Sequence, residues 1–171
     1  AIYRPFEFEK DASKDLNEED NKQYIQQRNL FDFMRRLLVK RFESSFGSFK
    51  QSILNFKEIT RMCQSFIDKT GEYILDRALL EKIESSDFDA DEIEKELLEY
   101  EDKISKGVFP KSHKRYKIKD FHDKEGFIQC IKEDLELFDE ILNELSKLDL
   151  VNNDPKTSCL IENIKKEFDK K

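Results

Sequence analysis

A run of apolar residues at helical spacing constrains this fold more than any other feature of the sequence. The run consists of Phe31, Met34, Leu38, Phe42, Phe46, Phe49, Ile53, Phe56, Ile59, Cys63 and Phe66. Its steps of three or four residues are typical of one face of an α-helix. A single helix over residues 21–69 would be about 70 Å long, whereas a compact chain of this length has a radius of gyration of about 15 Å. The stripe therefore predicts a projecting helix or a bend, and Gly47, in a serine-rich stretch, is the expected position of the bend.

The composition favours an all-α fold. Charged residues make up 40% of the 171 residues, and only four glycines and three prolines are available for turns. No alternating run rich in valine and isoleucine competes with the helical patterns. We expect a single domain, an elongated helical bundle built around one very long helix, with short loops and one short extended segment.

Shorter patterns divide this domain into four regions. We expect an extended, acidic entry over residues 1–20, the long helix over 21–69, an insertion with two helices and a basic loop over 70–122, and two C-terminal helices over 123–171.

Local signals place the elements within these regions. Thr70 and Gly71 mark the break after the long helix, and a short helix is expected over residues 72–83. Asp89 is expected to cap a second helix that stops at Gly107. An extended piece is expected at Tyr116, Ile118 and Phe121, followed by a helix over residues 124–148. A turn at Asn152 and Asn153 and a final helix opened by Asp154 and Pro155 complete the expected elements.

The net charge of −7 is unevenly distributed along the chain. Residues 84–102 hold ten acids and one lysine, net −9, whereas residues 106–119 hold five lysines, Arg115 and no acid, net +6. One interpretation of the basic segment is a solvated loop that neutralises the acidic helix before it. The other is contact with nucleic-acid phosphate, which needs cations but reads no bases. The residues expected to make such contacts are Lys111, Lys114, Arg115, Lys117 and Lys119.

The sequence contains no catalytic constellation. No Gly-rich phosphate-binding loop and no acidic box is present, so the chain itself is not expected to hydrolyse ATP. Asp87, Asp89 and Asp91 resemble the start of a calcium loop, but Glu92 stands where that loop needs glycine, so a capped helix start is preferred. His113 and His122 have no ligand partner at the spacing of a metal site, and we expect solvated loop histidines. We therefore predict no metal site and no cofactor in this chain.

The cysteines and the hydropathy indicate the compartment. Cys63, Cys130 and Cys159 are odd in number, lie far apart and fall in or beside apolar stripes, which predicts buried free thiols in a reducing environment. No apolar run approaches the length of a membrane span, and no signal peptide opens the chain. A cytoplasmic location is expected.

One block within the stripe resembles a known family. LLVKRFESSFGSFKQSI, at residues 37–53, is similar to a block of bacterial Swi/Snf-like ATP-dependent helicases, in a helical region between two RecA-like motor lobes. A weaker resemblance covers residues 134–168, where Asp154, Pro155 and Lys156 open a helix before the second lobe. Residues 72–119 show no resemblance.

The resemblance implies that the chain is a non-catalytic piece of a DNA-dependent ATPase. Its partners would be the motor lobes of the same chain and double-stranded DNA, and ATP and Mg²⁺ would be cofactors of the parent enzyme. The residues implied to dock a motor lobe are Lys40, Arg41, Glu43, Ser44 and Ser45. On periodicity alone, Ser44 and Ser45 are also explained as small residues that permit close helix packing. The alternative function is a free-standing helical module for protein–protein interaction.

Overall fold

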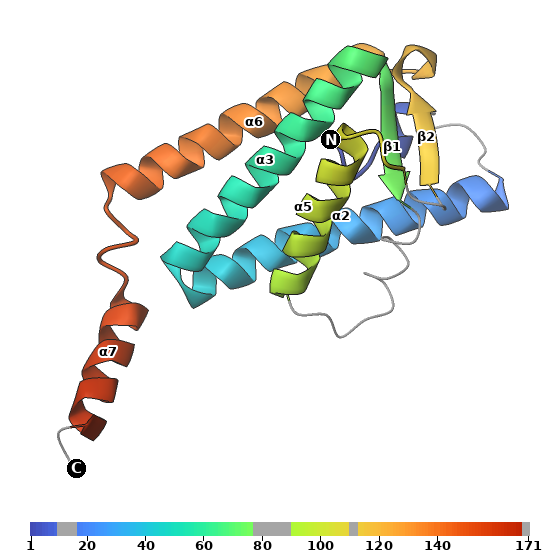
Figure 1. Cartoon of the computed structure of the whole chain (residues 1–171). Helices are drawn as coiled ribbons and strands as arrows, with labels where there is room; N and C mark the ends of the chain where they lie inside the picture. Colours follow the sequence, from blue (N-terminus) through green and yellow to red (C-terminus); the bar gives the residue numbers. More distant parts are fainter. Residues whose placement is uncertain (10–16, 77–89, 110–112, 169–171) are drawn as a thin grey trace.

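The structure is a computed structural model that describes residues 1–9, 17–76, 90–109 and 113–168. These residues form a mostly helical fold with one small sheet (Figure 1). The elements in chain order are α1 (Phe6–Glu9), α2 (Glu18–Ser44), α3 (Phe46–Thr70), β1 (Glu72–Asp76), α5 (Ala90–Ser105), β2 (His113–Lys117), the 3-10 helix η1 (Ile118–Asp120), α6 (Lys124–Lys147) and α7 (Pro155–Phe168). The predicted helical class is confirmed, with a two-stranded sheet in addition.

The expected single long helix is two helices that meet at Ser45. Ser45 has an extended backbone, with φ −161° and ψ 138°, and its Oγ accepts a hydrogen bond from the N–H of Gly47 at 3.1 Å. A serine that caps a new helix in this way ends the preceding one. The chain then turns back, so that α3 packs against α2 (Figure 1). The predicted bend therefore exists, but it lies two residues before Gly47.

The α3 helix ends where the sequence predicted, and a strand follows in place of the expected helix over residues 72–83. Gly71 adopts a left-handed conformation, with φ 70°, and its N–H donates to the carbonyl of Ile67 at 2.7 Å. Residues Glu72–Asp76 then pair antiparallel with β2. Tyr73 lies opposite Tyr116, and their rings stack with centroids 6.2 Å apart. This long-range pairing outweighs the local helical pattern; residues 77–83 lie outside the described part of the chain.

The first residues are also more ordered than the predicted extended entry. Phe6–Glu9 form one helical turn, and the Phe6 side chain is fully buried. The backbone N–H of Phe6 donates to Oε1 of the buried Gln27 at 2.9 Å. The Gln27 Nε2 donates in turn to the Tyr116 hydroxyl at 2.7 Å. One glutamine thus ties the N-terminal turn and α2 to the sheet.

The α3 helix lies at the centre of the fold, and α2, α5 and α6 pack against it (Figure 1). One hydrophobic core includes residues of all four helices and both strands. Lys57 of α3 also forms an ion pair with Asp139 of α6. The predicted helix over residues 124–148 is confirmed as α6, and Gly107, with φ 78°, follows the end of α5 as expected.

Candidate functional site

The corner between α2 and α3 is joined to the start of α7 by one carboxylate. Asp154 is 3% exposed, and its Oδ2 accepts a hydrogen bond from the backbone N–H of Phe46 at 2.9 Å. Its Oδ1 accepts from the N–H groups of Lys156 at 3.0 Å and Thr157 at 3.5 Å. Asp154 therefore caps two helices, α3 and α7, whose N-termini both favour a negative charge.

The hydrogen bonds at this corner also hold Asp154 in its ionised form. The bond from Phe46 lowers the pKa of Asp154 most, and the bonds from Lys156, Thr157 and the Ser45 side chain lower it further, against the opposing effect of burial. The helix start at Asp154 and Pro155 was predicted from the sequence. Its contact with α3 was not, because it joins residues 108 positions apart.

The five residues implied to dock a motor lobe lie along the end of α2. Lys40, Glu43 and Ser44 are exposed, whereas Arg41 and Ser45 are partly buried. Ser45 has a structural role, because it caps α3. Ser44 is exposed, so close helix packing does not explain it. Lys40, Glu43 and Ser44 are therefore the members of this set that are available to a partner.

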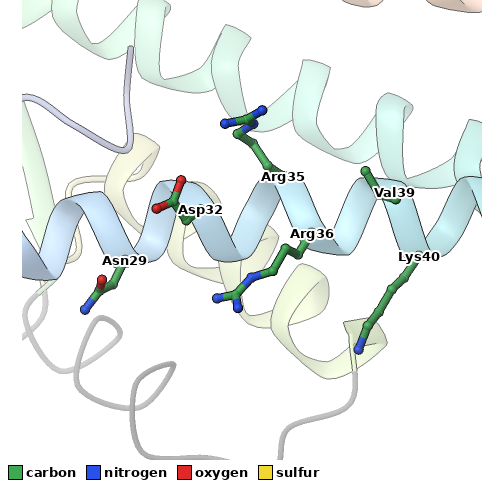
Figure 2. Close-up of a pocket in the computed structure, with 6 residues that line it drawn as sticks. All are labelled: Asn29, Asp32, Arg35, Arg36, Val39 and Lys40. Carbon is green, nitrogen blue, oxygen red and sulfur yellow. The ribbon is translucent and has the colours of Figure 1, made fainter.

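Lys40 also belongs to an open groove of about 720 Å³ along α2, shown in Figure 2. The lining residues within the described part of the chain are Asn29, Asp32, Arg35, Arg36, Val39 and Lys40. In Figure 2, Arg36 and Lys40 point away from α3, whereas Arg35 points toward it. The described lining residues include three cations and one carboxylate, a net positive charge that suits a partner with carboxylate or phosphate groups.

The basic residues expected to contact phosphate do not form one surface. Lys114 lies on the same face of β2 as the buried Tyr116 and is paired with Glu9 at 2.7 Å. Arg115 lies on the opposite face and is paired with Glu72 at 3.1 Å. Because adjacent residues of a strand point to opposite faces, Lys114 and Arg115 lie on different surfaces.

The remaining members of the basic set differ in their surroundings. Lys117 and Lys119 are exposed, and neither has an ion pair with another described residue. Lys111 lies outside the described residues. The solvated-loop interpretation is wrong for Lys114 and Arg115, which lie in a strand and are engaged by carboxylates.

A buried acid–thiol pair between α3 and α5 was not predicted. Glu101 is 5% exposed, and its carboxyl interacts with the thiol of Cys63, which is 1% exposed. Burial raises the pKa of Glu101 to about 8, and burial together with the Glu101 carboxyl raises the pKa of the Cys63 thiol. No sequence signal distinguishes Glu101 from the other acids of its segment.

The other cysteines and the histidines only partly follow the prediction. All three thiols are free, but Cys130 is partly buried and Cys159 is exposed, because the side of α7 that carries Cys159 packs on nothing within the described structure. His113 lies in β2 with its ring 5.9 Å from that of Phe109, so it is not a loop residue, whereas His122 is exposed.

Neither metal ligands nor membrane spans are evident in the described structure. Its described residues contain no group of three or more His, Cys, Asp or Glu that could hold a metal ion. Of the calcium-like triplet, Asp87 and Asp89 lie outside the described residues, and Asp91 lies in the first turn of α5. No described helix is long and apolar enough to cross a membrane.

Comparisons of the chain with protein-family models, with curated protein sequences and with solved structures gave no match.

Proposed function

We propose that this chain is a helical region that joins and positions the two RecA-like motor lobes of a Swi/Snf-like DNA-dependent ATPase. The observation that carries the proposal is the hydrogen bond between Asp154 and Phe46. It brings together the two segments that resemble that family, residues 37–53 and residues 134–168. Both segments would then form one structural unit, with the α2–α3 corner fixing where α7 starts.

The second support is the exposed apolar face of α7. This helix has no buried residue, and it projects from the rest of the structure (Figure 1). Leu160, Ile164 and Phe168 are spaced at four-residue intervals and are 60%, 47% and 74% exposed. An amphipathic helix with its apolar face exposed suits contact with a further protein surface. A motor lobe is the surface that the proposal assigns to it.

In this role the chain supplies no chemistry. ATP and Mg²⁺ would be bound by the motor lobes, and closure of the lobes around ATP would be transmitted through the corner at Ser45 and Asp154. Asp154 links two helix starts, so a movement of α7 would be passed to α3 without an intervening flexible joint. Lys40 and Glu43 would contact a lobe from the end of α2.

The proposal is tested in the parent enzyme with the exposed pair at the end of α2. Lys40→Ala with Glu43→Ala should lower DNA-stimulated ATP hydrolysis and leave basal hydrolysis unchanged, because docking shifts the population of closed lobes. The matched control is Glu58→Ala with Arg61→Ala, which removes one exposed acid and one exposed cation from α3. Equal effects of the two double variants would contradict docking through α2.

The alternative is a free-standing interaction module, and the exposed face of α7 supports it as well. The two functions differ in where the apolar face is used. A module would bind its partner without motor lobes in the same chain. Deleting residues 155–168 would then abolish partner binding and have no ATPase to affect.

A further inference from the structure

A second cavity lies at the opposite end of α3 from the Ser45 corner. It has a volume of about 520 Å³ and is formed by the end of α3, both strands, η1 and the first turns of α6. Its described lining residues are Ile67, Asp68, Thr70, Gly71, Glu72, Lys117, Ile118, Lys119, Lys124 and Ile128. Segments distant in the sequence thus build one pocket.

Three lysines line this pocket without a carboxylate partner among the described residues. Lys117, Lys119 and Lys124 are exposed and form no ion pair with any described residue. Two carboxylates also line the pocket, but Glu72 is already paired with Arg115 at 3.1 Å. Asp68 is the remaining acid among the described lining residues, so three available lysines and one available carboxylate line this part of the pocket. The pocket therefore attracts anions.

The floor of the pocket is apolar. Ile67 and Ile118 are 5% and 3% exposed, and Ile128 is partly buried. These side chains are buried or partly buried and do not protrude, as side chains that insert into a lipid surface would. The volume exceeds that of a single phosphate ion. A sugar–phosphate backbone, with anionic oxygens for the lysines and an apolar sugar edge for the floor, fits both features.

We propose that this pocket binds the phosphate backbone of duplex DNA through Lys117, Lys119 and Lys124, an inference that rests on the proposed function for its choice of DNA. This site differs from the set of basic residues predicted from the sequence. It includes Lys124, and it excludes Lys114 and Arg115 because these two are paired with carboxylates of the same chain. Backbone contact through lysines carries no base recognition, so binding is independent of sequence.

The test uses the 171-residue chain and a labelled duplex of about 20 bp, with binding followed by fluorescence anisotropy between about 20 and 150 mM salt. The triple variant Lys117→Gln, Lys119→Gln, Lys124→Gln should lower the log–log salt slope by about 2.7, or about 0.9 for each lost contact. The matched control, Lys156→Gln, Lys165→Gln, Lys166→Gln, removes three exposed lysines from α7 and should keep the slope.

Three results would overturn the inference. They are equal slope losses in both triple variants, no duplex binding at the lowest salt, and binding only to vesicles that contain phosphatidylserine. Circular dichroism melting of each variant shows that it is folded, and the three pocket lysines are exposed, so little change is expected. The salt slope of DNA binding is independent of the ATPase test with Lys40 and Glu43. If those two residues do not dock a motor lobe, the salt slope is unaffected.

Discussion

The buried carboxyl of Glu101 should make the stability of this protein fall as the pH rises. Burial raises the pKa of Glu101 from 4.5 to about 8. Between these values the folded chain keeps a proton that the unfolded chain releases. The free energy of unfolding therefore decreases with pH in this window, by about 1.4 kcal/mol for each pH unit. The full stability contribution is present below the unfolded pKa and is lost as the pH approaches the folded one.

Replacing Glu101 with glutamine should remove this dependence. Glutamine has nearly the same shape and cannot ionise, so it avoids a cost of about 3 kcal/mol at pH 7, which follows from the difference between pH 7 and the unfolded pKa. We expect Glu101→Gln to raise the free energy of unfolding at pH 7 by about 2–3 kcal/mol and to leave it nearly unchanged near pH 4.5. Urea denaturation at several pH values between these limits measures both effects.

The control is Glu99→Gln on the same helix. Glu99 is exposed and lies 4.0 Å from Lys95 and Lys103, contacts that contribute about 0.5 kcal/mol or less. This variant should keep the pH dependence of the parent chain. If Glu101→Gln and the parent chain lose stability with the same slope as the pH rises, the assignment of the buried proton to Glu101 is wrong.

Three further predictions concern the corner, the core and the thiols. Gly47→Ala should stabilise the chain by up to about 1 kcal/mol in a thermal melt, because an added Cβ would meet its nearest neighbour at an ordinary 3.5 Å; a destabilised variant would mean that the corner is tighter than described. Gln27→Leu should lower the free energy of unfolding by about 2–4 kcal/mol, since it removes the two buried hydrogen bonds that Gln27 makes to the N–H of Phe6 and to the Tyr116 hydroxyl, and a neutral result in urea would refute that role. Cys159 should react with a thiol reagent in the native protein and Cys63 only on unfolding, so rapid labelling of Cys63 would contradict its burial.

Local patterns in the sequence predicted the elements that are governed by local interactions. The α6 stripe, the glycine after α5 and the start of α7 at Pro155 depend on neighbouring residues, and all three were found. The break at Ser45 was displaced because the apolar spacing continues through it. Phe42 lies on α2, yet its ring contacts that of Phe46 on α3 at a centroid distance of 5.3 Å, so the stripe hides the corner.

Contacts between distant residues could not be predicted from the sequence. The strand at Glu72–Asp76 forms because it pairs with β2, about forty residues later, against a local helical pattern. The candidate sites also depend on contacts between distant residues. The sequence predicts Asp154 only as the cap of the last helix, whereas in the structure it also accepts a hydrogen bond from Phe46. The lysines of the second pocket come from three elements, β2, η1 and α6.

The gene sequence on either side of these 171 residues tests the central claim most directly. The proposed function requires a Gly-rich phosphate-binding loop with lysine and an acidic box to be encoded upstream, because these groups hold ATP and Mg²⁺ in a motor lobe. It also requires the strands and helices of a second lobe to be encoded downstream of α7. An open reading frame with both features is the predicted result. A reading frame without a phosphate-binding loop on either side would contradict the claim and favour the interaction module.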